Sequence, residues 1–166
     1  KLCHNGRIRF CSYRIKRDPM LPDGVSNGVS KFRAFREVTM ILVAGSANLD
    51  FVVRAGHIPA PGETVLGREF NTFPGGKGAN QALACARAGG VPTAMLLALG
   101  NDAFATPLVD SLTQAGVQLH TVRASTEPTG TAFICVSDDG ENAITVAPGA
   151  NNALLPEHLA RHLPSL

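Results

Sequence analysis

Short apolar runs separated by glycine, proline and polar residues dominate the chain from residue 40 onward. The run MILVAGS, which begins at Met40, is typical of a buried strand in a parallel sheet, and it ends in the Gly and Ser of a turn. Residues 49–55 and 63–70 predict two further strands. The HIPAPG between them favours a turn, so we expect these two strands to pair as a hairpin.

Helices and apolar strands alternate in the next part of the chain. After a cluster of glycines, the alanine-rich residues 78–88 favour a helix that two following glycines would end. Residues 93–99 predict a buried strand, and Asn101 or Asp102 can cap a helix that runs to the next glycine. Residues 117–122 predict the strand after it. This alternation is typical of a parallel sheet covered by helices, which places the fold in the α/β class.

The pattern then changes to two consecutive strands. Residues 129–137 and 141–147 have β-type composition, and the Asp-Gly between them is a strong hairpin signal. Together the two hairpins predict a small second sheet over one end of the main sheet, in the place of a lid. Residues 156–163 predict one more short helix.

Charge divides the chain of 166 residues, whose net charge is +2, into two segments. Residues 1–39 carry nine Lys and Arg against three Asp and Glu, whereas residues 40–166 carry six against ten. Residues 1–39 also lack sustained periodicity, so we expect the domain to begin at Met40. We interpret 1–39 as a disordered or non-native extension, such as a cloning remnant or a translated upstream region, with a transit peptide as the alternative.

Composition excludes several classes of protein. The longest apolar run, Ala94–Leu99, is far shorter than the roughly 20 residues of a membrane-spanning helix. Four cysteines without a CxxC pair indicate neither a disulfide framework nor a zinc site, and reduced thiols fit a cytoplasmic protein. An acidic body without a basic stripe argues against a nucleic-acid partner.

The glycine loop PGGKGAN, at residues 74–80, is the most informative segment. Its glycines permit close approach of a ligand, and the helix start after them offers free N–H groups, so an anionic or hydroxyl-rich ligand can dock there. The loop is not a Walker A motif, because Gly78 follows Lys77 where Ser or Thr is required. A tight strand-to-helix connection with a solvated lysine is the alternative.

Asn48 and Asp50 form the second candidate, because they follow the first strand at the sheet edge where α/β proteins bind ligands. Carboxylate and amide groups suit the hydroxyls of a polyol, although an Asx-type turn would also explain both residues. Two other clusters are interpreted structurally. The acidic residues Asp138, Asp139 and Glu141 are expected at a hairpin tip, and His158 and His162 lack a third metal ligand.

Five segments in this order resemble the N-terminal half of the ribokinase-like (PfkB-type) carbohydrate kinase family: AGSANLD, PAPGETVLG, FPGGKGANQALACARAGG, LGND and TGTAFICVSDDGENAITVAPGAN. The resemblance covers residues 40–166. It implies a three-layer α/β/α fold with a small β-sheet lid, and transfer of the ATP γ-phosphoryl group to a sugar hydroxymethyl group, with D-ribose as the substrate. It implies Mg²⁺ as a cofactor, leaves a monovalent cation open, and implies a homodimer formed through the lid strands. Sugar contacts would come from Asn48, Leu49, Asp50, Gly76, Lys77, Gly78, Ala79 and Asn80.

The family's catalytic aspartate lies in a GAGD-type motif, and no GxGD occurs in this sequence. We therefore expect no catalytic residue in this chain, a fold truncated after its N-terminal half, and no activity of the fragment alone. Two alternatives remain open. One is a kinase of another sugar or nucleoside, of the fructokinase or adenosine kinase type, and the other is a non-catalytic sugar-binding remnant.

Overall fold

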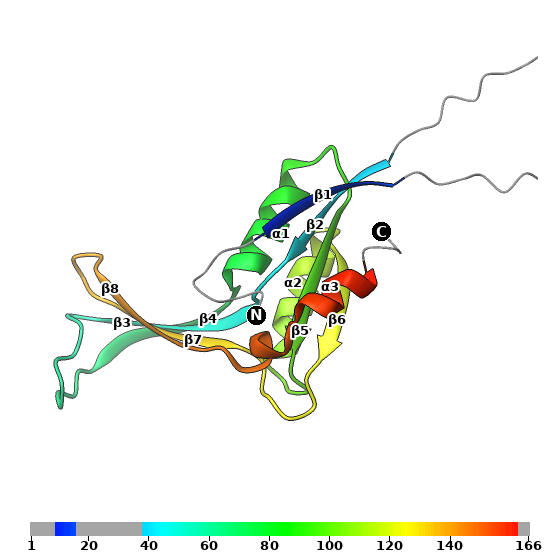
Figure 1. Ribbon diagram of the computed structural model, residues 1–166. Helices are drawn as coiled ribbons and strands as arrows, with labels where there is room; N and C mark the ends of the chain where they lie inside the picture. Colours follow the sequence, from blue (N-terminus) through cyan, green and yellow to red (C-terminus); the bar gives the residue numbers. More distant parts are fainter. Residues whose placement is uncertain (1–8, 16–37, 163–166) are drawn as a thin grey trace, which may run out of the picture.

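The computed structural model describes residues 9–15 and 38–162 (Figure 1). In chain order its elements are β1 (Arg9–Ile15), β2 (Val38–Ala44), β3 (Asn48–Ala55), β4 (Gly67–Gly75), α1 (Lys77–Ala88), β5 (Thr93–Leu99), α2 (Ala105–Gln114), β6 (Gln118–Arg123), β7 (Thr131–Val136), β8 (Asn142–Ala147), the 3₁₀ helix η1 (Gly149–Ala153) and α3 (Pro156–His162). No helix in these two ranges is long and apolar enough to cross a membrane.

The main sheet has the strand order β1-β2-β5-β6. β5 is parallel to both β2 and β6, which confirms the predicted βαβ framework. β2 begins at Val38, two residues before the predicted start. β1 comes from the basic segment and pairs with β2 in the antiparallel sense. The rest of that segment lies outside the described residues, so our interpretation of residues 1–39 stays a prediction.

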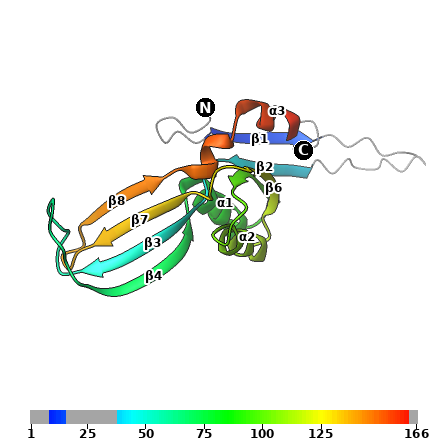
Figure 2. The same ribbon diagram turned by 90° about the horizontal axis from the view of Figure 1, so that it is seen from below.

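Helices cover both faces of the main sheet, as expected for three layers (Figure 2). Alternate residues of β5 point to opposite faces. Met95, Leu97 and Leu99 pack with α1 and α2, and this cluster includes Ala82 and Leu108. The other face carries Ala94, Leu96 and Ala98. These pack with Leu154, which directly follows η1, and with Leu159 of α3. All seven residues of β5 are buried, which explains why its sequence is apolar without alternation.

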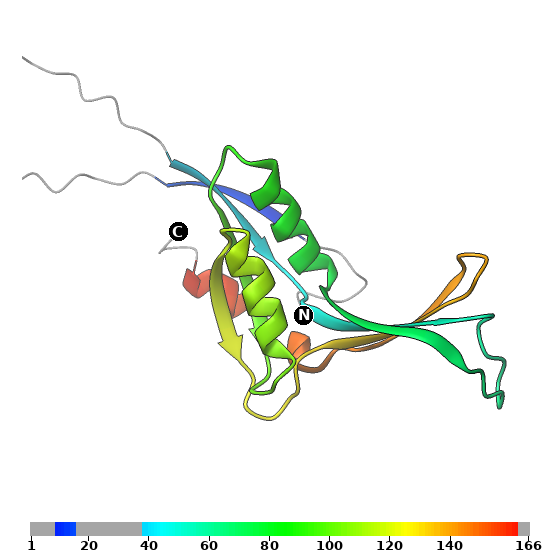
Figure 3. The same ribbon diagram turned by 180° about the vertical axis from the view of Figure 1, so that it is seen from behind.

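The two predicted hairpins form one sheet of order β4-β3-β7-β8, here called the lid sheet. β3 pairs with β4 and β7 with β8 in the antiparallel sense, and the parallel pair β3–β7 joins the two hairpins. The lid sheet projects from the carboxyl end of β2 away from the helical layers (Figures 1 and 3). The short turn at residues 45–47 connects β2 of the main sheet to β3 of the lid sheet.

The prediction for the strand at residues 63–70 was wrong in its bounds, because β4 runs from Gly67 to Gly75. Residues 63–66 belong to the preceding loop, where Ala60 N donates to Glu63 Oε2 at 2.8 Å. The strand continues through Pro74 since β4 is the edge of the lid sheet, where a missing N–H breaks no ladder. The strand therefore delivers Gly75 directly to the glycine loop.

Asp102 does not cap α2 in the predicted way. The N-cap position is Phe104, whose side chain makes no capping bond. Asp102 Oδ1 instead accepts from Phe104 N at 3.0 Å, and its Oδ2 accepts from Thr129 N at 2.7 Å. The aspartate thus ties the start of α2 to the segment that leads into β7.

Candidate functional site

A pocket of about 360 Å³ opens where the lid sheet joins the main sheet. Its floor comes from the end of the β2–β3 turn and the start of β3, one wall from the start of α1, and the facing wall from β7, β8 and η1. It therefore lies beyond the carboxyl end of β2, where open α/β sheets bind ligands. The lining residues are Ser46, Asn48, Asp50, Gly76, Lys77, Asn80, Ala132, Ile134, Ile144, Val146, Pro148, Asn151 and Asn152.

Asn48 and Asp50 reach the pocket from one face of β3, because alternate residues of a strand lie on the same side. Asn48 is buried. Asp50 is half-buried, and this burial raises the pKa of its carboxyl above the ordinary value of 3.8. An ionised carboxylate accepts hydrogen bonds through two oxygens, which matches two neighbouring hydroxyl groups. The floor thus offers one amide and one strong acceptor.

Two glycines allow the glycine loop to lie against this floor. A Cβ added to Gly75 would collide with the carboxylate of Asp50. Gly76 has a φ of +93°, and its added Cβ would stand 2.7 Å from Ala47 Cα and 2.8 Å from Asn48 N. Since neither position has room for a side chain, the loop backbone itself forms this part of the pocket.

The first turn of α1 supplies two exposed polar side chains, Lys77 and Asn80. They are three residues apart and so share one face of the helix. Gly76, the N-cap of α1, also lines the pocket, so the positive end of the helix dipole lies at this wall. This wall favours oxygen-rich groups.

Three predicted contact residues, Leu49, Gly78 and Ala79, do not line the pocket. All three are buried. Leu49 N donates to Gly130 O at 2.9 Å, and Ala79 N donates to Ser46 O at 3.0 Å. A Cβ on Gly78 would stand 2.6 Å from the carbonyl carbon of Gly45. Their part in the geometry is to fix the backbone behind the pocket.

Sequence reasoning missed the wall that faces α1. Ala132 and Ile134 of β7 and Ile144 and Val146 of β8 give it an apolar surface. The β-type pattern predicted these strands but could not show which of their faces would meet the glycine loop. Asn151 was also missed, because nothing local in the sequence indicates that η1 returns to the end of β2.

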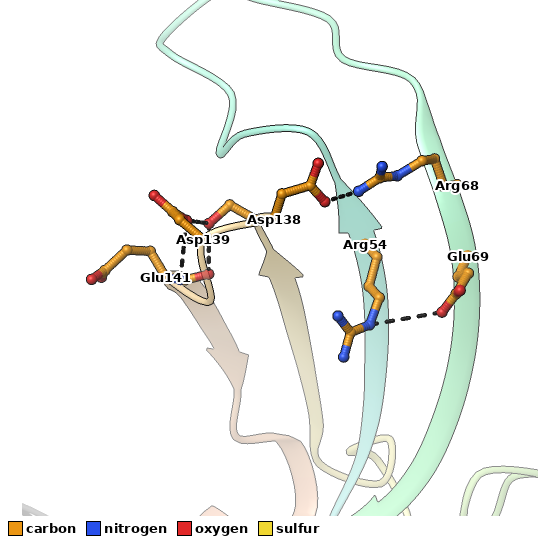
Figure 4. A network of polar contacts seen from close by, with 7 residues as sticks. Arg54, Arg68, Glu69, Asp138, Asp139 and Glu141 are labelled. Atoms are coloured by element: carbon orange, nitrogen blue, oxygen red, sulfur yellow. Dashed lines mark hydrogen bonds and ion pairs between the residues drawn. The ribbon is translucent and has the colours of Figure 1, made fainter.

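The acidic cluster at the lid tip takes part in contacts within the lid (Figure 4). Asp138 forms an ion pair with Arg68, and Arg54 pairs with Glu69 at 3.7 Å. Asp139 accepts from Ser137 Oγ, and this bond together with one from the Glu141 backbone lowers the pKa of Asp139. Figure 4 shows these residues in the β7–β8 turn and on the neighbouring strands, so they hold the tip of the sheet together.

The pocket combines a polar floor and wall with one apolar wall. A small polyol has this character, since its hydroxyl groups and its C–H face require different surroundings. Among the described residues, no three His, Cys, Asp or Glu side chains gather in a way that could hold a metal ion. The amide, carboxylate and ammonium groups of the pocket can bind and orient hydroxyl groups.

Comparison with known proteins agrees with this description. The family model described as pfkB family carbohydrate kinase matches residues 38–166. The ribokinase of Lactococcus lactis is 42% identical over 123 residues, which cover 74% of this chain and 41% of that protein. The structure of ribokinase from Giardia lamblia matches with a TM-score of 0.68 and 33% identity, over 74% of this chain and 37% of that one.

The structure of Arabidopsis thaliana ribokinase complexed with ribose and ATP matches with a TM-score of 0.59 and 37% identity, over 68% of this chain and 36% of that one. The chain thus spans about two fifths of the length of the curated relatives it matches. The fold is the corresponding part of the ribokinase-like α/β/α fold with its lid sheet. Since the family model covers well over half of the chain, the protein belongs to the pfkB family of carbohydrate kinases.

Proposed function

We propose that this chain supplies the sugar-binding part of an ATP-dependent kinase that phosphorylates the hydroxymethyl group of D-ribose. The proposal rests on the pocket, which has a volume of about 360 Å³ and is lined by Asn48 and Asp50 together with the start of α1. In this proposal Asp50 accepts hydrogen bonds from sugar hydroxyls, while Lys77 and Asn80 donate to sugar oxygens from the other wall. Ribokinases are among its relatives, which favours ribose over other sugars.

The apolar wall gives the lid sheet its part in the proposal. Ile134, Ile144 and Val146 would cover the C–H face of the sugar and exclude water from it. Because phosphoryl transfer depends mainly on positioning and electrostatic stabilisation, a pocket that orients the hydroxymethyl group contributes directly to the reaction. Leu49, Gly78 and Ala79 serve the site through their backbone positions.

The described residues contain no cluster of His, Cys, Asp or Glu side chains that fits a Mg²⁺ site, and residues 74–80 do not form a Walker A loop. We propose that the catalytic base, ATP, Mg²⁺ and any monovalent cation are held outside residues 38–162. We likewise propose a cytoplasmic protein whose domain begins near residue 40, with residues 1–39 as an extension.

A homodimer through the lid is part of the same proposal. The lid face opposite the pocket carries Phe51 between Phe70 and Phe133, with ring centroids 6.2 and 5.4 Å away. Phe70 is 63% exposed and Phe133 is 54% exposed. An aromatic cluster of this kind on a surface favours contact with a protein partner, and a second copy of the lid presents a matching face.

A panel of ligands tests the substrate proposal. Isothermal titration of the purified chain with D-ribose, D-fructose and adenosine should give a one-site isotherm with ribose and a weaker one with fructose. An ATP-coupled assay of the same samples should show no phosphorylation of ribose, because the catalytic base and the ATP site are proposed to lie outside residues 38–162, and turnover by this chain alone would contradict that part of the proposal. If fructose or adenosine bound more tightly than ribose, that compound would be assigned as the substrate in place of ribose. If none of the three bound, the proposal would be contradicted.

A further inference from the structure

Asn151 is a buried polar residue of η1, with 5% of its surface exposed, and its side chain is fully engaged in hydrogen bonds. Its Oδ1 accepts from Ala47 N at 3.0 Å. Its Nδ2 donates to Asn48 Oδ1 at 2.8 Å, to Pro148 O at 3.0 Å and to Ala47 O at 3.2 Å. The side chain therefore holds both backbone groups of Ala47 and the side chain of Asn48, more than 100 residues away in sequence.

These bonds determine which way the amide of Asn48 faces. Ala47 N–H is a backbone donor, so the atom of Asn151 that meets it must be the acceptor Oδ1. The other atom of Asn151 is then the donor Nδ2, and Asn48 must present its own Oδ1 to it. An isolated asparagine amide can turn over at small cost, but this chain of bonds permits one orientation of Asn48.

The fixed orientation leaves the Nδ2 of Asn48 for a ligand. Asn48 lines the pocket, and within the described residues its Nδ2 has no hydrogen-bond partner. Asp50, two residues along the same strand face, is an acceptor when ionised. The floor then presents a donor and an acceptor side by side, which matches neighbouring hydroxyl groups that accept from one residue and donate to the other.

Gly130 makes the contact between the two asparagines possible. It is buried immediately before β7, and a Cβ at this position would collide with Asn151 Nδ2 and stand 2.5 Å from Asn48 Oδ1. The backbone of Gly130 is held in turn by Leu49 N, which donates to its carbonyl oxygen at 2.9 Å. An alanine here would separate the same two side chains while leaving both in the sequence.

We propose that Asn151 is a positioning residue for the sugar site, which holds Asn48 with its Nδ2 donor toward the ligand. This inference rests on the proposed function, because it assigns the donor to a hydroxyl oxygen of the sugar. It adds a residue of η1, outside the glycine loop and β3, to those that determine which hydroxyl pattern the pocket accepts.

A double-mutant cycle tests the positioning role. The affinities for D-ribose and its monodeoxy analogues are measured by calorimetry for the wild type, Asn48→Ala, Asn151→Asp and the double variant. Asn151→Asp keeps an acceptor for Ala47 N but forces the amide of Asn48 to turn over. It should weaken ribose binding by about tenfold, the equivalent of one hydrogen bond. The analogue that lacks the hydroxyl held by Asn48 should bind Asn151→Asp with the same affinity as the wild type. The double variant should bind ribose with the affinity of Asn48→Ala.

Gly130→Ala is the second variant and should reproduce the selectivity change of Asn151→Asp. The exposed Asn101→Ala is the matched control and should bind ribose like the wild type. Equal weakening of ribose and every analogue by Asn151→Asp, or a further loss in the Asn48→Ala background, would overturn the positioning role alone. A wild type that binds no pentose would contradict the proposed function instead.

The ¹⁵N side-chain amide signals of Asn48 provide a readout that needs no sugar. In the wild type they should differ from those of Asn151→Asp and Gly130→Ala, because the hydrogen bond to Asn151 is broken in both variants. Signals that do not change in either variant would overturn the inference whatever the sugar titrations show.

Discussion

Gly75 lies directly against the carboxylate of Asp50, so that a single added Cβ would collide with Asp50 Oδ2. The two residues face each other across the β3–β4 pair, where Asn48 is the ladder partner of Gly75 and Asp50 is two residues further along. The glycine at the end of β4 therefore determines whether the acceptor on the pocket floor can adopt its observed position. The glycine loop and the polar residues of β3, Asn48 and Asp50, therefore form a single site.

Replacing Gly75 by alanine should move the Asp50 carboxylate and weaken D-ribose binding by about tenfold or more, the equivalent of at least one lost hydrogen bond to a charged group. The measurement is calorimetric titration. Gly56→Ala is the matched control, because an added Cβ at Gly56 meets no atom within 4 Å. An unchanged affinity in Gly75→Ala would mean that Asp50 does not contact the sugar from its observed position.

The pH dependence of binding should report the ionisation of Asp50. Burial raises the pKa of this carboxyl above the ordinary 3.8. As the pH is lowered, ribose affinity should therefore begin to decrease before the pH reaches 3.8, because the acceptor becomes protonated. Asp50→Asn should bind weakly with little pH dependence over the same range. The check is titration at several pH values, and a steep dependence that persists in Asp50→Asn would assign the ionisation to another group.

The same substitution should not reduce stability at neutral pH. A carboxyl whose pKa is raised in the folded state contributes stability below its unfolded pKa, and this contribution is lost as the pH rises through the folded pKa. At pH 7 the ionised Asp50 therefore disfavours folding, and Asp50→Asn should melt at the same temperature as the wild type or higher. A clearly lower melting temperature would show that Asp50 stabilises the fold.

Gly76→Ala should destabilise the protein by about 2 kcal/mol or more, because it combines a positive φ with backbone contacts under 3.0 Å. Gly116→Ala is the comparison, since its φ is +79° but its added Cβ meets no atom within 4 Å. That variant should lose about 1 kcal/mol from backbone strain alone. Urea unfolding measures both, and equal losses would show that the contact with residues 46–48 relaxes easily.

The parts of the fold and of the candidate site that could be predicted are those whose sequence signal lies within the element itself. The glycine loop, Asn48 and Asp50 were identified because each sits at a strand or helix end that the apolar pattern locates. The bounds of β4 were wrong because pairing with β3 carries the strand through Pro74, which a local pattern cannot show. Asn151 escaped notice because its contact with Asn48 exists only after η1 folds back onto β2.

The aromatic face of the lid provides a test of self-association. Phe133→Ser should shift the protein from dimer to monomer in sedimentation equilibrium, because Phe133 stacks on Phe51 and is exposed on the face opposite the pocket. Leu66→Ser is the matched control, since Leu66 is 88% exposed but lies outside the aromatic cluster. A monomeric wild type would contradict the proposed homodimer, and loss of the dimer in the Leu66→Ser control alone would place the interface outside the aromatic cluster.

A titration of ¹⁵N-labelled protein with D-ribose, followed through its backbone amide signals, shows directly whether the pocket binds the sugar. We expect saturable shifts to concentrate at the pocket residues of β3 and at the start of α1, namely Asn48, Asp50, Gly76, Lys77 and Asn80. Signals of Phe51 and Phe133 on the opposite lid face should stay in place. Ribose that shifts no signals, or that shifts those of the aromatic face instead of the pocket, would contradict it.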